Sequence, residues 1–155
     1  MLADWAARQK EHDLRARKRQ SVAMLRQGAG KGRKGLWVWD KAGVDFPFWQ
    51  DRKASGIYFL SLRKEGLCLE VAQERVLAAT QPINQGVTSD RLGVDRRGIR
   101  VRKITFCNPC DGAVYVYLTS ELTLAPGLLA LLYKTRWEIE QVFDETKTKL
   151  AEKKL

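Results

Sequence analysis

The sequence has few of the residues that mark a secreted or membrane-embedded protein. Its 155 residues include only three cysteines and one histidine. An odd number of cysteines argues against a framework of paired disulfides and suits a reducing compartment. No apolar run approaches the roughly 20 residues that span a membrane, and the N-terminus is charged where a signal peptide would be apolar. We therefore expect a soluble cytoplasmic protein with no membrane partner.

Acidic residues are also in the minority. Lys and Arg number 28 against 18 Asp and Glu, which gives a net charge of +10 and a pI near 9.8. Such an excess favours polyanionic partners, with nucleic acid ahead of a membrane surface. The alternative is a soluble protein that is basic without binding a polyanion. The length and the 45% of hydrophobic residues fit one globular domain.

Segments of different pattern follow one another along the chain. Residues 2–27 predict a basic helix, and the glycine-rich stretch 28–35 contains no Ser or Thr, which excludes a Walker phosphate loop. The run GLWVWD and residues 56–62 are apolar strands around a short helix, which is typical of a parallel sheet covered on both faces. Residues 63–120 alternate β-like runs with turns, and we expect antiparallel hairpins separate from the parallel strands.

The rest of the chain predicts one long helix with Pro126 in its first turn. Five apolar residues are expected to line its buried face: Leu128, Leu132, Ile139, Phe143 and Leu150. The sequence thus indicates an α/β fold in four parts. These are a basic helix and loop at 1–35, a strand–helix–strand core at 36–62, a β-rich insertion at 63–120 and a C-terminal helix at 121–155.

A narrow stripe of mixed polar residues on that last helix is the most informative feature. In YKTRWEIEQVFDETK, Arg136, Glu140 and Lys147 lie 3, 7 and 14 positions after Tyr133. At about 100° per residue the four side chains fall within roughly 60° of one helix face. Phosphoryl transfer needs carboxylates that hold divalent metal and cations that bind phosphate oxygens, and the stripe supplies both. The alternative is an exposed Arg136–Glu140 pair, worth about 0.2–0.5 kcal/mol.

Asp40 ends the apolar run GLWVWD. At the carboxyl end of a parallel strand, where α/β sheets form their sites, an aspartate can serve as a metal ligand. An acidic turn residue is the ordinary alternative at such a position.

Two patterns in the β-rich part have competing interpretations. Cys107 and Cys110 form a single C-x-x-C, which favours a hairpin turn over a zinc site because no second ligand pair has suitable spacing. Arg100 and Arg102 point the same way in a strand, either as a solvated face or as contacts to a nucleic-acid backbone.

Together these residues resemble a known family. The series Tyr133, Arg136, Glu140 and Lys147 is similar to the Tyr-(2)-Arg-(3)-Glu-(6)-Lys signature of bacterial insertion-sequence transposases, the insertion-sequence-four family of DDE enzymes. The block WVWDKAGVDFPFWQDRKASGIYFLSLRK looks like that family's strand with the second catalytic Asp, its next helix and its next strand. The resemblance covers roughly residues 36–150.

The resemblance implies a partial ribonuclease-H-like core, with parallel strands plus a catalytic helix, that carries a β-rich insertion. In such a core three carboxylates bind two magnesium or manganese ions, which activate water and later a 3′-hydroxyl for DNA cleavage and strand transfer. Asp40 would be the second carboxylate and Glu140 the third. Tyr133, Arg136 and Lys147 would grip DNA phosphates.

The resemblance also implies DNA as the partner, both transposon ends and target, a homodimer in the full-length form, and a nucleoid-associated place in a bacterial cytoplasm. Two features depart from the family. No residue matches the first Asp, since Asp4 and Asp13 lie in helix-like sequence, and residues 50–136 lack the Trp that often stacks on a displaced base. We therefore expect a truncated transposase, inactive alone; the alternative is a non-catalytic DNA-binding remnant or a regulator of a full-length transposase.

Overall fold

The computed structural model describes residues 33–39 and 45–138. The predicted basic helix at 2–27 and most of the glycine-rich loop lie outside these ranges. In chain order the elements are β1 (Gly35–Trp39), α4 (Phe46–Lys53), β2 (Ile57–Leu62), β3 (Glu70–Glu74), the short 3₁₀ turn η2 (Pro82–Asn84), β4 (Val87–Val94), β5 (Arg100–Cys107) and β6 (Val114–Thr119). A further helix at residues 126–138, here named the C-terminal helix, follows β6.

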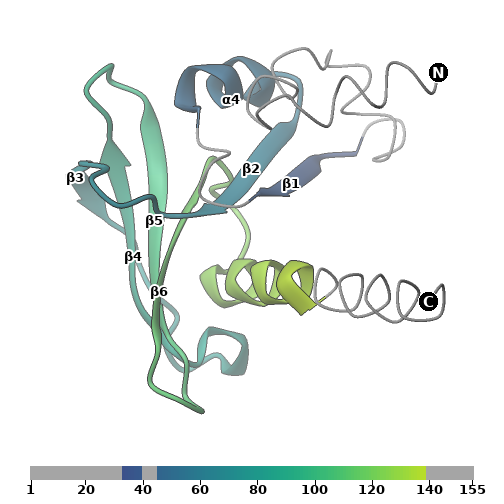
Figure 1. The fold of residues 1–155 in the computed structure, drawn as a ribbon, viewed down its shortest axis with the longest axis vertical. Helices are drawn as coiled ribbons and strands as arrows, with labels where there is room; N and C mark the ends of the chain where they lie inside the picture. Colours follow the sequence, from purple (N-terminus) through teal and green to yellow (C-terminus); the bar gives the residue numbers. More distant parts are fainter. Residues whose placement is uncertain (1–32, 40–44, 139–155) are drawn as a thin grey trace, which may run out of the picture.

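The strands form one six-stranded sheet in the order β1-β2-β6-β5-β4-β3 (Figure 1). β1 and β2 are parallel, with Trp37 opposite Phe59, and the other neighbours are antiparallel. The α/β class and the strand–helix–strand unit are confirmed. The expected separation of the hairpins from the parallel strands is wrong, because β6 pairs directly with β2 through Leu60 and Thr119. Once β6 supplies hydrogen bonds to the free edge of β2, the sheet continues without interruption.

Local sequence explains α4, the short helix expected between the parallel strands. The Asp45 side chain accepts a hydrogen bond from the backbone N–H of Phe48 at 3.1 Å, which caps the helix start. Pro47 lies in the first turn, where its missing N–H is not needed. Arg52 and Lys53 lie in the last turn, where cations complement the helix dipole.

One strand of the β-rich segment, β4, has a sequence that is not typical of a strand. Its run VTSDRLGV places Asp90 in the middle and Gly93 near the end, residues that are depleted in strands. Asp90 is nevertheless 3% exposed, because Arg102 of the neighbouring β5 pairs with it. A contact between distant residues therefore stabilises this strand.

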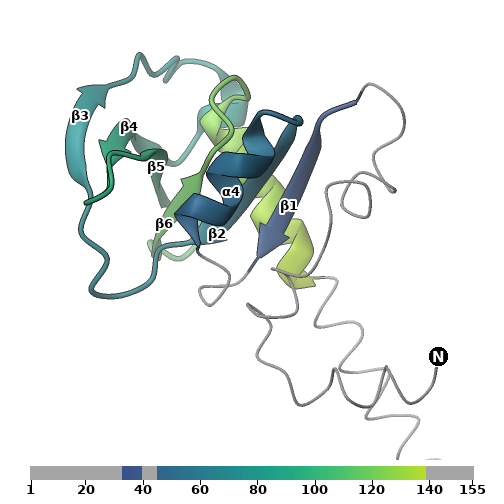
Figure 2. The ribbon, with the colours of Figure 1, turned by 90° about the horizontal axis from the view of Figure 1, so that it is seen from above.

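The two helices cover opposite faces of the sheet, as Figure 2 shows. On β2, Ile57 and Phe59 belong to the buried cluster that includes α4, whereas Leu60 belongs to the cluster that includes the C-terminal helix. On β6, Leu118 packs with the α4 cluster and Tyr117 with the other one. Successive side chains of a strand point to opposite faces, so the two clusters are the two faces of one sheet.

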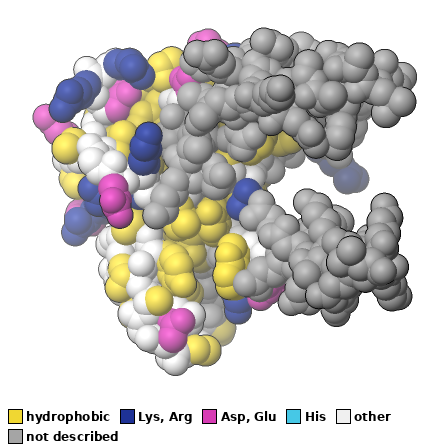
Figure 3. Space-filling model, in the orientation of Figure 1, with side chains coloured by type: hydrophobic (Ala, Val, Ile, Leu, Met, Phe, Trp, Pro, Cys, Tyr) yellow, Lys and Arg dark blue, Asp and Glu magenta, His cyan; other side chains and the backbone are white. Residues whose placement is uncertain are grey.

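Charged side chains are spread unevenly over the surface. On the face shown in Figure 3, most visible Lys and Arg side chains lie toward the upper left. Figure 1 places β3 and the turn between β4 and β5 in that region. Asp and Glu side chains lie in the same region, so charges of both signs gather at the β3 end of the described surface on this face.

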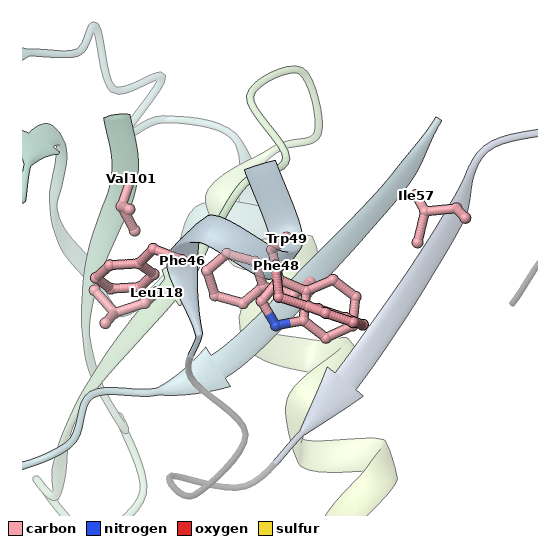
Figure 4. Close-up of a cluster of buried hydrophobic side chains, with 7 residues drawn as sticks. Phe46, Phe48, Trp49, Ile57, Val101 and Leu118 are labelled. Carbon is pink, nitrogen blue, oxygen red and sulfur yellow. The ribbon is translucent and has the colours of Figure 1, made fainter. Parts of the chain in front are cut away.

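Aromatic side chains form most of the core beneath α4 (Figure 4). Trp49 is 1% exposed, and its ring centroid lies 5.0 Å from that of Phe48 and 5.7 Å from that of Phe59. Phe46 lies 6.1 Å from Phe59 and packs toward Val101 and Leu118 of the antiparallel strands. Each buried aromatic removes about 150–250 Å² from water, so α4 joins the parallel and antiparallel parts into one core.

The C-terminal helix packs on the sheet with a different face from the one predicted. Leu129, Ala130 and Tyr133 are buried. Leu128 is only half-buried, and Leu132 is 36% exposed. The predicted buried face is therefore wrong for the described part of the helix. The other residues assigned to that face, Ile139, Phe143 and Leu150, lie outside the described residues.

Close backbone contact explains this choice of face. The helix begins at Pro126 as expected, and a Cβ added at Gly127 would lie 1.7 Å from the carbonyl oxygen of Ile83. Only glycine allows the first helical turn to approach η2 this closely. Hydrophobicity alone predicts that Leu128 and Leu132 face the sheet. The close contact between Gly127 and Ile83 instead fixes which side of the helix meets the sheet.

Candidate functional site

The structure describes two of the five residues of the predicted catalytic site. Tyr133 and Arg136 lie on the C-terminal helix. Asp40, Glu140 and Lys147 lie outside the described residues. In the sequence, Asp40 directly follows the last residue of β1, and Glu140 comes two positions after the last described residue of the helix.

The C-terminal helix lies beside the parallel strands. Leu36 and Val38 of β1 pack against the buried cluster that contains Leu129 and the rest of the helix core. Figures 1 and 2 show the same arrangement from two directions. Asp40 and Glu140 can approach each other in one metal site only if this helix packs beside the strand that leads to Asp40, and the described parts of both elements do so. The approach of Asp40 to Glu140 stays a prediction.

Tyr133 lies in the core. It is 7% exposed, and its ring centroid is 5.2 Å from that of Tyr117 on β6, with the two planes tilted by 47°. Burial, together with the neighbouring Tyr115 and Tyr133, raises the pKa of Tyr117 to about 12. Both phenols therefore contribute apolar surface to the sheet–helix contact, whatever their hydroxyl groups bind.

The described part of the predicted polar stripe, Tyr133 and Arg136, lies on the helix face that meets the sheet. At about 100° per residue, Leu129, Ala130, Tyr133 and Arg136 fall within about 120° of the helix circumference. The first three are buried, and Arg136, one turn further on, is half-buried. The face that starts as core therefore becomes polar and partly exposed at Arg136.

The start of this helix is held by η2. The side chain of Asn84 accepts a hydrogen bond from the backbone N–H of Gly127 at 3.1 Å. The same side chain donates to the carbonyl oxygen of Ala78 at 3.1 Å, and Asn84 is 3% exposed. One buried amide thus satisfies a free N–H of the helix end and ties it to the β-rich segment.

A buried arginine holds the turn that leads into the helix. Arg102, 1% exposed, donates from Nε and Nη2 to the two carboxylate oxygens of Asp90 at 2.9 and 2.8 Å. Its Nη1 donates to the main-chain oxygens of Leu124 at 2.8 Å and Glu121 at 3.4 Å. The Arg102 guanidinium therefore joins the middle of the sheet to the last residues before the helix. Its bidentate contact with the Asp90 carboxylate fixes the plane of the guanidinium.

Arg75 adds a second link of the same kind. Its Nη2 donates to the main-chain oxygen of Leu122 at 2.6 Å, and its Nε lies 3.4 Å from the Asp90 carboxylate. The Asp90 carboxylate therefore forms ion pairs with two arginines. The Arg75 side chain is 27% exposed, and the Arg102 side chain is buried. Both cations bind carbonyl oxygens of the turn at 121–124, so their positive charge is shared between an acid and the turn backbone.

Glu121 closes the network from within the turn. It is 4% exposed, accepts hydrogen bonds from the backbone N–H groups of Thr123 at 2.9 Å and Leu124 at 2.7 Å, and has one oxygen 3.7 Å from Arg102. Burial pushes the pKa of Glu121 upward. Hydrogen bonds from the Thr123 side chain and from the Leu124 and Thr123 backbone, together with the Arg102 charge, outweigh it and hold the pKa below its ordinary value.

The two strand arginines predicted as DNA contacts differ in exposure. Arg100 is exposed, whereas Arg102 is buried in the network just described. Only Arg100 offers its guanidinium at the surface in this structure. Reasoning from the sequence did not single out Asp90, Arg75, Glu121 or Asn84. Each of them binds a residue of a distant element, 12 to 47 positions away, and no local spacing marks those contacts.

Within the described ranges, no group of three or more His, Cys, Asp and Glu side chains is placed to hold a metal ion. Cys68, Cys107 and Cys110 are free thiols, and the C-x-x-C run lies in a hairpin turn where Cys110 N–H donates to the Asn108 side chain. No helix in the described part of the chain combines the length and apolar character needed to cross a membrane.

Comparison with known proteins identifies one family. The family model of the transposase DDE domain matches residues 3–155, almost the whole chain. No curated protein matches the sequence.

Proposed function

The chain belongs to the transposase DDE domain family, and from this premise we propose that it contributes Asp40, Glu140 and a set of phosphate-binding side chains to a site for DNA strand cleavage and transfer. The family acts in DNA transposition, so DNA is the substrate class. One observation carries the proposal. The C-terminal helix, which bears the polar stripe, packs beside β1, whose sequence runs directly into Asp40.

Asp40 and Glu140 have the proposed role of metal ligands. Carboxylate oxygens are the ligands that Mg²⁺ prefers in proteins, and Mn²⁺ accepts the same set. When bound, two such ions would supply the charge that activates the attacking oxygen and stabilises the leaving oxygen. The chain itself would hold the two carboxylates on a strand and a helix that share one core, which keeps their geometry fixed.

We assign the parallel pair β1 and β2, together with the C-terminal helix, to a ribonuclease-H-like core. The parallel register and the helix on one face support this assignment. The antiparallel strands β3 to β6 would then be the insertion of the family. Asn84, Arg75 and Arg102 of that insertion bind the start of the C-terminal helix and the turn before it. The insertion would therefore orient the helix that carries Glu140.

Arg136 and Lys147 have the proposed role of phosphate clamps beside the scissile bond, with the Tyr133 hydroxyl as a third donor. Arg136 lies where the buried helix face becomes polar, so its guanidinium is partly shielded from water. Charge-assisted hydrogen bonds to phosphate are about twice as strong as neutral ones, and partial shielding strengthens them further. Arg100, exposed on β5, is a further proposed contact to the DNA backbone.

DNA affinity measured at several salt concentrations tests the clamps. Arg136→Ala and Lys147→Ala should each weaken binding and reduce the slope of log affinity against log salt by about 0.7–0.9, the value of one lost phosphate contact. Lys134→Ala is the matched control, because Lys134 is exposed on the same helix and faces Glu138 at 3.8 Å. Equal losses in all three variants would show that only net charge matters and would remove the proposed clamps.

A cleavage assay tests whether this chain completes a catalytic site on its own; the alternative function is that of a non-catalytic DNA-binding remnant or a regulator of a full-length transposase. The net charge of +10 supports salt-sensitive DNA binding in either case. No residue of this chain has been assigned as the first carboxylate of the family, and two ligands cannot complete the clamp on both reacting oxygens. We therefore expect the isolated chain to bind end-labelled DNA but not to nick it in Mg²⁺ or Mn²⁺. Specific nicking that is lost in Glu140→Ala would contradict this expectation.

A further inference from the structure

A cleft of about 1000 Å³ opens on the α4 side of the sheet, opposite the C-terminal helix. Three segments that are distant in the sequence line it: the start of α4, the connection at residues 64–68 after β2, and the turn at 95–97 between β4 and β5. Its apolar part comes from Phe46, Phe48 and Leu67. Of the predicted catalytic residues, the two that the structure describes, Tyr133 and Arg136, do not line it.

Four cations line the cleft: Arg52, Lys64, Arg96 and Arg97. Lys64, Arg96 and Arg97 are exposed, and among the described residues none of these three forms an ion pair with a carboxylate. Arg52 is held on the cleft wall, with its guanidinium 3.8 Å over the Phe48 ring centroid and Nη1 3.5 Å from the Phe48 carbonyl oxygen. A guanidinium stacked in this way keeps its position when an anion approaches.

Three carboxylates also line the cleft, and two of them already bind the cleft's own backbone. Asp45 accepts the Phe48 N–H at 3.1 Å, and Asp95 accepts the N–H groups of Arg97 and Ile99, both at 2.9 Å. Their negative charge therefore organises the α4 start and the 95–97 turn. The remaining acid, Asp51, is exposed at the rim. A compact anion would meet acids and cations together, whereas an extended polyanion can follow the exposed cations.

A further cation, Lys103, lies on the same face of the sheet as the cleft. Lys103 lies two positions after Val101, which packs on the α4 side, so it shares that face. Burial, together with the charges of Arg63 and Arg91, holds the pKa of Lys103 below its ordinary value of 10.5. Like charges gathered in this way favour the arrival of an anion that relieves their repulsion.

We propose that this cleft binds the sugar–phosphate backbone of a DNA segment other than the one held by the C-terminal helix. The two surfaces lie on opposite faces of one sheet, so a single short stretch of backbone cannot occupy both. Phosphates bind the exposed cations of the 64–68 and 95–97 segments, and the apolar floor at Phe46, Phe48 and Leu67 accepts the sugar edge. This site depends on DNA as the partner of the family and is independent of the clamps Arg136 and Lys147.

An exposed thiol in the cleft, Cys68, reports its occupancy. In the full chain with Cys107→Ser and Cys110→Ser, the rate at which uncharged iodoacetamide alkylates Cys68 is measured with and without saturating DNA. The measurement is made with a duplex and with a single-stranded oligonucleotide. We expect at least one of them to slow the alkylation of Cys68 by about tenfold or more. An unchanged rate with both at saturation overturns the proposal.

Substitution of the turn cations gives a second and independent measurement. Arg96→Ala/Arg97→Ala should reduce the salt slope of DNA binding by about 1.4–1.8, the value of two lost phosphate contacts. Lys53→Ala/Lys134→Ala removes the same charge outside the cleft and should change the slope less. Equal changes in the two pairs overturn the proposal. If the salt slope of DNA binding falls in Arg96→Ala/Arg97→Ala but not in Arg136→Ala, the proposal for the cleft stands and the proposed phosphate clamps on the C-terminal helix are refuted.

Discussion

Arg102 and Asp90 form an ion pair inside the protein, with 2.8 Å between Nη2 and Oδ2 and side-chain exposures of 1% and 2%. The pair joins β5 to β4, and through Leu124 and Glu121 it reaches the turn before the C-terminal helix. A charge left unpaired at this depth is costly, since water cannot replace the lost partner.

We expect Arg102→Met to lower the free energy of unfolding by about 3–5 kcal/mol, because it leaves the Asp90 carboxylate with only the partly exposed Arg75. Urea unfolding followed by tryptophan fluorescence measures the change. The control is Glu74→Gln, which breaks the more exposed Arg91–Glu74 pair on the same sheet and should cost about 0–1 kcal/mol. Similar costs for both variants would mean that burial of the Arg102 pair is energetically unimportant.

Glu121 should make stability depend on pH in the acid range. Hydrogen bonds hold its pKa in the folded state below the ordinary value of 4.5, so the unfolded chain binds a proton first as the pH falls. The stabilisation by Glu121 is therefore complete above pH 4.5 and is lost as the pH falls through the lowered folded pKa. Urea unfolding of the wild type and Glu121→Gln from pH 7 to pH 3 should show a difference that shrinks below pH 4.5. A difference that stays constant over this range would refute the assignment.

Gly127→Ala should destabilise the protein, although glycine to alanine usually stabilises a helix by about 0.5–1 kcal/mol. The added Cβ would lie 1.7 Å from the Ile83 carbonyl oxygen, a backbone atom that cannot move alone. Separating the helix from η2 would weaken the bond between Asn84 and Gly127. Overpacking of this kind costs about 1–3 kcal/mol, measurable by thermal unfolding. A gain in stability would show that the close contact is not required.

Two substitutions of Tyr133 should distinguish its contribution to core packing from its contribution to DNA binding. Tyr133→Ala removes a buried ring that contacts Tyr117 and should cost about 3–5 kcal/mol of stability. Tyr133→Phe keeps the ring, so we expect a folded protein whose DNA affinity falls about fivefold to tenfold, the value of one hydrogen bond. Fluorescence anisotropy with labelled DNA measures this loss. Wild-type affinity in the folded Phe variant would remove the hydroxyl from the proposed clamp.

Elements whose signal is local agree with the sequence-based predictions. The apolar runs of β1 and β2, the short helix between them and the helix start at Pro126 can each be read from a few neighbouring residues. β4 could not, because Asp90 in its middle is compatible with a buried strand only once Arg102 pairs with it. Local sequence carries no information about that pairing.

The orientation of the C-terminal helix shows the same limit. The leucines at 128 and 132 form a better apolar stripe than Leu129, Ala130 and Tyr133, yet the latter are buried. The contact between Gly127 and Ile83 selects this face, and it joins residues that are 44 positions apart. The tyrosine of the predicted DNA-binding stripe consequently packs in the core, which the helical periodicity of the stripe alone does not indicate.

Binding of Mn²⁺ to the full chain, followed by electron paramagnetic resonance, most directly tests whether Asp40 and Glu140 share one metal site. We expect one weak site, displaced by Mg²⁺, that is lost in Asp40→Asn and equally in Glu140→Gln, because each carboxylate alone is an insufficient ligand. Glu138→Gln, a change at an exposed position of the same helix, should leave it intact. Wild-type Mn²⁺ affinity in either Asp40→Asn or Glu140→Gln would contradict a shared site and, with it, the proposed function.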